Sequence, residues 1–549
     1  GPAAILILDA PDANQTIGSS GTGSYLLKDL VFTLDGPTAN RTKTINVPTN
    51  LNLYGDFRAS VTGGSAGAQL IVNVNTVTLG GTPQNINIGA WCQLYTSHAS
   101  FSTSFMDLFT GTKTFDVFST VYYALNGAQS IADGFTYGNL GMNNGNKTAE
   151  GPLDINGNVY SNGAVFYDAG FTHTVAGDWR LATAQYTAAS ATGTIVLDGM
   201  NQYIDNANPS IFRHLVIAGS GTVTANNNVT VLGNLQINIG STFDGNIRTI
   251  NVGGNWTELG NGTFTQTTGT VSFNGTAIQS ISQSASSAFA NVTIANTGAA
   301  GADTVKALTD LQINGGLTIT QDAGVFSIQG KKLYLGDNLN VYPNANNAST
   351  FITTGSTVYL NGNGATNQIV ANRDNIPLEF NHLELTGSKT KVFGYSNTSN
   401  LFRINGNLTI NGATLRADGT WGTAPNIDVY GDWTNTGTFI HTQTTTFRGG
   451  NQNISSSTFN NVVFAGTNTK TLQGNITVNG SLTINTGATL DANNYNISVS
   501  GTWNNSAAGA VFVPGTATVT LTGNSSSIST GTSSGPAPGK SFYNVVINK

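Results

Sequence analysis

Residues 475–484 have the sequence NITVNGSLTI, and residues 497–503 have the sequence ISVSGTW. In both, apolar and polar residues alternate over a few positions until Gly, Asn or Ser intervenes, which is typical of half-buried strands between tight turns. With residues 446–454 and 459–464, these segments predict a unit of four short strands over residues 446–523. No segment is long enough to predict a substantial helix.

The composition favours a chain that buries its core in thin layers. Charged residues make up 9% of the 549 residues, whereas 39% are hydrophobic and 67 are Gly. The net charge of -6 and the regular apolar pattern argue against disorder, and the absence of a basic stripe argues against nucleic acid as a partner. Cys92 is the only cysteine, so an internal disulfide and a cysteine-based zinc site are excluded. No run of 18 apolar residues predicts a membrane span.

Three markers recur in the same order along the chain. The first is a Gln, usually two residues before an Ile, and it occurs at Gln15, Gln84, Gln129, Gln202, Gln279, Gln368 and Gln452. The second is an aromatic residue before an aliphatic strand, as at Phe212, Phe289, Phe380 and Phe542. The third is Gly, a polar residue and an aromatic, which includes Trp179, Trp256, Trp433 and Trp503. Such regular placement predicts that these four tryptophans belong to the structural core.

Two all-β architectures fit these repeats. Pairs such as Asn405-Gly406, Asn411-Gly412 and Asn479-Gly480 are typical of hairpin turns, which favours tandem β-sandwich domains. Strands of three or four residues pair poorly in isolation, however, and suit a solenoid in which each strand stacks in parallel on the coil before it. We therefore expect a parallel β-helix (β-solenoid) of irregular multi-coil repeats, with about 24 coils of roughly 20–25 residues.

The regularity of the repeats predicts two regions. Residues 193–549 follow the markers closely, and we expect regular β-solenoid repeats there. Residues 1–192 are β-rich but diverged, with a specialised insertion expected near residues 90–158. That insertion contains Trp91, Cys92, Phe101, Phe105, Met106 and Phe109.

Residues 406–415 (GNLTINGATL) and 480–491 (GSLTINTGATLD), each followed by the Gly-x-Trp marker, carry a resemblance to a known group of proteins. The chain resembles the large prokaryotic cell-surface and secreted β-helix repeat proteins, which are adhesin-like in character. The resemblance implies an extracellular or cell-surface location and a structural or adhesive role. It transfers no catalytic residue.

The chemistry-bearing residues form no motif that predicts catalysis. Carbohydrate cleavage on a β-helix needs two or three grouped carboxylates, and the densest charged segment here is Arg373-Asp374 with Glu379, His382 and Glu384. The ordinary interpretation of that segment is a solvent-exposed bulge on the side of the solenoid. The histidines share no metal-ligand spacing, and His214 and His382 occupy a repeat slot that holds Asn in sister copies, which indicates stacking. We expect no enzyme activity, no cofactor and no metal.

Asn-x-Ser/Thr triplets are plentiful, as this composition would produce by chance, so they indicate glycosylation only weakly. The triplets expected in surface loops are those at Asn40, Asn146, Asn347 and Asn397.

Two function classes remain, with a third as a distant alternative. The first is a non-enzymatic, rod-like surface fibre or filament subunit, and the second is an adhesin that binds glycans or cell surfaces through loops on the rod. The third is a polysaccharide-cleaving β-helix enzyme. Residues 4–8 and 544–549 read as open strands, which predicts that copies of the chain join end to end by strand addition. A fragment of a longer rod fits the same observation.

Overall fold

The computed structural model describes residues 4–9, 13–18, 25–36, 39–46, 51–63, 68–181, 192–205, 210–299, 301–320, 324–342, 350–373, 376–396, 401–531 and 539–548. The chain divides into two compact units, Gly1–Gly269 and Thr270–Lys549. Each unit is a parallel β-solenoid, and about 22 turns are present in all, which confirms the predicted fold class. The sequence-based boundary at residues 192/193 was drawn from repeat regularity and stays a prediction.

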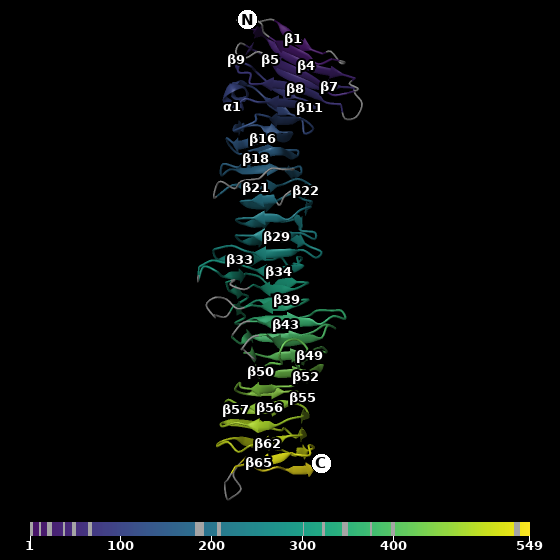
Figure 1. The fold of residues 1–549 in the computed structure, drawn as a ribbon, viewed down its shortest axis with the longest axis vertical. Helices are drawn as coiled ribbons and strands as arrows, with labels where there is room; N and C mark the ends of the chain where they lie inside the picture. Colours follow the sequence, from purple (N-terminus) through teal and green to yellow (C-terminus); the bar gives the residue numbers. More distant parts are fainter. Residues whose placement is uncertain are drawn as a thin grey trace. The chain divides into compact units, whose positions relative to one another are not determined.

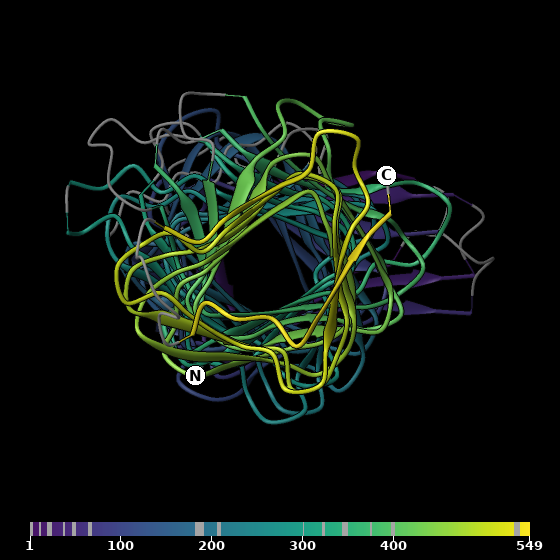
Figure 2. The same cartoon turned by 90° about the horizontal axis from the view of Figure 1, so that it is seen from below.

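In the second unit, three short strands make one coil. The coil of β56 (Asn461–Phe464), β57 (Asn468–Leu472) and β58 (Ile476–Val478) is followed by β59 (Leu482–Ile484), β60 (Ala488–Asp491) and β61 (Ile497–Val499). Each strand pairs in parallel with its counterpart one coil later, so that Val462 lies beside Leu482, and Ile476 beside Ile497. Figure 1 shows the successive strands of this unit stacked on one another, and Figure 2 shows its last coils, in yellow, surrounding one interior.

The first unit is built in the same way. Its coils include β4 (Asp29–Asp35), β5 (Arg41–Asn46) and β6 (Leu51–Leu53), which are followed by β7 (Phe57–Thr62), β8 (Leu70–Asn75) and β9 (Leu79–Gly81). The longest sheet of this unit continues through β11 (Cys92–Thr96), β13 (Thr120–Tyr123), β16 (Asn139–Ala149), β18 (Val159–Tyr167), β20 (Trp179–Leu181) and β22 (Gln202–Ile204). Every other residue points inward, as the burial of Leu70, Val72 and Val74 in β8 shows.

Parallel pairing overturns the tandem-sandwich alternative. Every pair of named strands whose register is described is parallel, and hairpin-linked sheets require antiparallel pairs. Two of the three Asn-Gly pairs, at Gly406 and Gly480, lie where one coil closely approaches the coil before it. A side chain at Gly406 would lie 2.6 Å from the His382 ring, and one at Gly480 would lie 2.3 Å from the Asn461 carboxamide. These two glycines leave room for a corner side chain of the previous coil.

The corner at residues 479–481 also divides the strand that the sequence predicts over residues 475–484. β58 ends at Val478 and β59 begins at Leu482, so the two halves lie on different faces of the coil. β57 and β60, which were not among the predicted strands of this unit, form the third face.

The divergent part of the first unit contains the helical turns of the described residues, α1 (Phe101–Ser104) and the 3₁₀ turn Met106–Leu108. They insert apolar side chains into the core rather than forming a surface loop. The ring of Phe105 lies 5.6 Å from that of Phe57, and Phe101 packs edge-to-face on Tyr123. Trp91 differs from these residues because 46% of its surface is exposed.

Candidate functional site

The recurring Gln is an interior residue that ties one coil to another. Gln452 is 2% exposed, its Nε2 donates to the carbonyl oxygens of Val429 and Gly431, and its Oε1 accepts from the Gly449 N–H at 2.9 Å. Gln368 bridges the carbonyls of Leu335 and Asp337 in the same way. Gln129, Gln202 and Gln279 are also buried. Gln15 is only half-buried, and Gln84 is exposed and donates to the Thr82 carbonyl.

A buried lysine stacks on several of these glutamines one coil later. We call each such pair a Gln–Lys clamp, and the clamps are Gln15/Lys43, Gln129/Lys147, Gln368/Lys391 and Gln452/Lys470. All four lysines are 0% exposed. The Lys470 ammonium donates to the carbonyls of Gly449, Gly450 and Thr467 at 2.7–3.2 Å. The clamp therefore satisfies backbone carbonyls at a coil corner that would otherwise be buried without partners.

The clamps were missed from the sequence, although a signal was present. Lys470 stands two residues before the inward-facing Leu472, so strand alternation places it inside. Burial lowers the pKa of Lys147, Lys391 and Lys470 to about 8. A lysine with a lowered pKa is a recognised nucleophile. Here each ammonium is enclosed by carbonyl acceptors and lines neither of the two cavities described for this chain, which supports a structural role.

A position at one corner of the coil, which holds His in some copies and Asn in others, also ties one coil to the next. His214 Nδ1 accepts from the Asn234 N–H at 2.9 Å, and His382 Nδ1 accepts from the Asn407 N–H at 3.0 Å. In the sister copies, Asn461 Oδ1 accepts from the Ser481 N–H at 2.9 Å. The stacking interpretation of both histidines is confirmed. Within the described ranges, no group of three or more His, Cys, Asp or Glu side chains could hold a metal ion.

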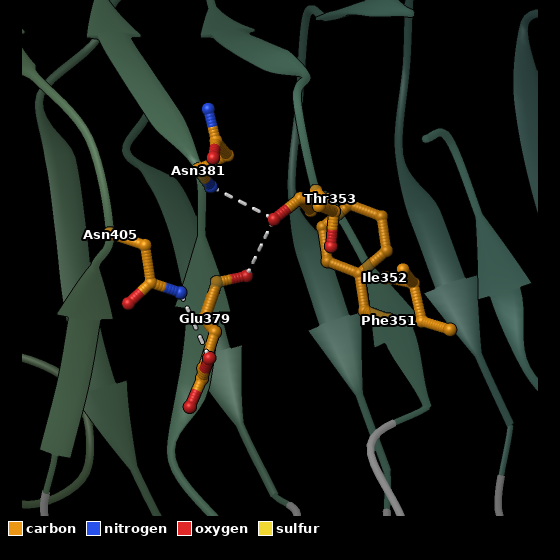
Figure 3. A pocket seen from close by; sticks show the side chains of 7 residues that line it. Phe351, Ile352, Thr353, Glu379, Asn381 and Asn405 are labelled. Atoms are coloured by element: carbon orange, nitrogen blue, oxygen red, sulfur yellow. Dashed lines mark hydrogen bonds between the residues drawn. The ribbon is translucent and has the colours of Figure 1, made fainter. Parts of the chain in front are cut away.

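Glu379, in the densest charged segment, borders a pocket of about 340 Å³ in the second unit. The pocket lies where one sheet ends at β41 (Phe351–Ile352) and another begins at β44 (Leu378–Phe380). Figure 3 shows Thr353 between the two strands: its hydroxyl donates to the Glu379 carbonyl at 3.2 Å and accepts from the Asn381 N–H at 2.9 Å. The Thr353 hydroxyl thus joins two strands that do not pair.

The charged side chains of this segment do not converge on the pocket. The Glu379 carboxylate pairs with Arg403 and accepts from Asn405 Nδ2 at 3.0 Å. The Arg373 guanidinium lies 5.0 Å from the ring centres of Tyr342 and Trp421. Asp374 lies outside the described residues. Among the described residues that line the pocket, Glu379 is the one carboxylate, whereas glycosidic cleavage ordinarily uses two facing carboxylates.

The four marker tryptophans lie inside the solenoids, with at most 2% of each exposed. Trp433 packs against Phe439, Phe447 and Phe459, and its indole N–H donates to Ser457 Oγ at 2.8 Å. Cys92 is buried as well, and burial raises its pKa to about 12, so its thiol is protonated at neutral pH.

Two of the four predicted glycosylation positions lie in the described ranges. Asn40 is exposed, and its Oδ1 accepts from the Gln69 N–H. Asn146 is exposed too, but it lies within strand β16 and not in a loop as expected. Asn347 and Asn397 fall outside the described residues.

Comparisons with protein-family models, curated proteins and solved structures gave no match. The helices in the described part of the chain are too short and too polar to cross a membrane.

Proposed function

We propose that this chain is a non-enzymatic structural protein of the cell surface or the extracellular space, which forms filaments by end-to-end stacking of copies. One observation carries the proposal: the buried Gln, Lys and corner His and Asn side chains tie one coil to the next. Buried polar groups in an enzyme instead converge on a cavity where a substrate binds.

The terminal coils of each unit support the stacking part of the proposal. In the first unit, Ile5 and Ile7 are 52% and 54% exposed beside a groove of about 530 Å³. In the second unit, Val545 and Ile547 are 40% and 67% exposed. A further coil, supplied by a second copy or by more of the same chain, would cover these apolar residues and pair with β1 (Ile5–Leu8) and β66 (Asn544–Ile547).

The test of the non-enzymatic role is incubation with plant, algal and bacterial polysaccharides, followed by assays for new reducing ends and unsaturated products. We expect no cleavage. Reproducible cleavage that Glu379→Gln abolishes would overturn the proposal and favour the polysaccharide-cleaving alternative.

A further inference from the structure

The divergent segment of the first unit carries two pairs of stacked aromatic rings toward solvent. The rings of Trp91 and Phe118 are 5.2 Å apart with an interplanar angle of 10°, and these residues are 46% and 57% exposed. Four residues after each of these turn residues, the half-buried rings of Tyr95 in β11 and Tyr122 in β13 stack at 4.5 Å. We call these four residues the aromatic ledge.

The backbone at Trp91 adopts a conformation that is rare for a bulky residue. Trp91 has a φ of +63° in the turn closed by the hydrogen bond from the Cys92 N–H to the Gly89 carbonyl. Apart from Trp91 and Ala169, the non-glycine residues with positive φ in the described ranges are all asparagines. A bulky residue in this region is strained, and such strain concentrates at functional sites. Here the strained turn directs an indole out of the coil.

The side chain between the two ring pairs is an uncharged amide. Gln93 lies between the ring pairs, donates from Nε2 to Gln69 Oε1 at 2.6 Å and accepts from the Tyr95 hydroxyl at 3.2 Å. The nearby Asp116 carboxylate accepts from the Phe118 N–H, and the chain carries a net charge of -6. These charges disfavour a polyanion such as nucleic acid. Flat rings with amide and hydroxyl neighbours suit the apolar faces and hydroxyl edges of neutral sugar rings.

We propose that the aromatic ledge binds a neutral polysaccharide, with sugar rings packed against Trp91 and Phe118 and hydroxyl groups bound by Gln93 and the tyrosines. This activity adds to the structural role and does not depend on it. A scaffold that carried this site would attach to a glycan surface without cleaving it.

The test is affinity electrophoresis of the full chain in gels that contain mixed-linkage β-glucan, xylan, galactomannan or dextran, with alginate as an anionic comparison. We expect at least one neutral polysaccharide to retard the protein. Trp91→Gly and Phe118→Ala should each weaken binding about tenfold, which corresponds to the loss of one stacking contact. Tyr203→Ala is the matched control, because Tyr203 is 45% exposed in β22 of the same unit, and its binding should be unchanged.

Trp91→Gly also separates a binding role from a structural one. Glycine adopts a positive φ without strain, so this variant should keep or raise the melting temperature while binding falls. The proposal is overturned if no neutral polysaccharide retards the wild type, if Trp91→Gly binds as well as the wild type, or if alginate alone is bound. It is equally overturned if Trp91→Gly only converts a dimer into a monomer, because the ledge would then contact a second copy of the chain.

Discussion

At the residue scale, the buried lysines show what the sequence could and could not predict. The spacing of the markers was enough to place Trp433 and Gln452 in fixed repeat slots, because these residue types recur there. The sequence does not mark Lys470 by a fixed spacing, since Lys follows its Gln by 18 residues in two clamps but by 28 in Gln15/Lys43 and by 23 in Gln368/Lys391. Its role depends on which residues of two coils meet, and that register is set by corner lengths that differ between coils.

The buried lysines should make the stability of the protein depend on pH. Burial lowers the folded-state pKa of Lys147, Lys391 and Lys470 from 10.5 to about 8, so between these values the unfolded chain binds more protons than the folded one. Stability should therefore rise as the pH rises above about 8. Burial also raises the pKa of the Cys92 thiol from 9.0 to about 12 and raises the pKa of Tyr123 and Tyr137, so Cys92 opposes the rise above about pH 9 and the tyrosines oppose it above about pH 10. Urea unfolding at several pH values between 8 and 10 measures this increase in the free energy of unfolding. The increase should be smaller in Lys470→Met than in the wild type. An identical pH dependence in this variant would contradict the assignment.

The interior position of Trp433 also leads to a prediction about stability. Because it fills an interior layer among three phenylalanines, Trp433→Ala should lower the free energy of unfolding by about 3–5 kcal/mol. Denaturant unfolding of the variant measures the loss. Tyr203→Ala, at an exposed position, should change stability by less than about 0.5 kcal/mol. Efficient quenching of Trp433 by iodide in the intact protein would count against its interior position.

At the element scale, alternation predicted the strands, but the corners decided how they were divided. Residues 475–484 read as one strand because Asn479-Gly480-Ser481 keeps the alternation, yet the chain turns there so that Gly480 fits against Asn461 of the previous coil. The break between β41 and β44 could not be predicted, because it depends on the two strands failing to pair, and a single sequence does not report pairing.

From this break between the sheets, we expect the Thr353 hydroxyl to contribute to stability. Its hydroxyl joins the Glu379 carbonyl to the Asn381 N–H across the two sheets, so Thr353→Val leaves both backbone groups without this partner. The variant should lose roughly 1–3 kcal/mol of stability. Thr483→Val in β59 is the matched control, because Thr483 is half-buried in a paired strand, and it should change stability by less than about 0.5 kcal/mol. Equal effects of the two changes would show that the Thr353 hydroxyl contributes nothing at the break.

At the scale of the whole molecule, repeats and composition predicted the solenoid, because every coil needs the same corners and the same alternation. The proposed assembly would add strands of a second copy beside β1 and β66, which lie at the ends of their sheets in the described chain. We expect electron microscopy of the purified chain to show filaments, and deletion of residues 1–8 to leave folded monomers. Filaments that persist after the deletion would rule out docking through β1. Native material whose single covalent chain is much longer than 549 residues would instead show that the sequence is a fragment of a longer protein.

The central claim is that the buried polar side chains bind one coil to the next, and a double-mutant cycle on the clamp at Gly449 tests it most directly. Gln452 accepts from the Gly449 N–H, and Lys470 donates to the Gly449 carbonyl. Gln452→Leu and Lys470→Met should each lower the free energy of unfolding by roughly 1–3 kcal/mol. The double variant should lose less than the sum of the two, by at least about 0.5 kcal/mol, because both residues hold the same corner. Single variants as stable as the wild type, or strictly additive losses, would contradict the account.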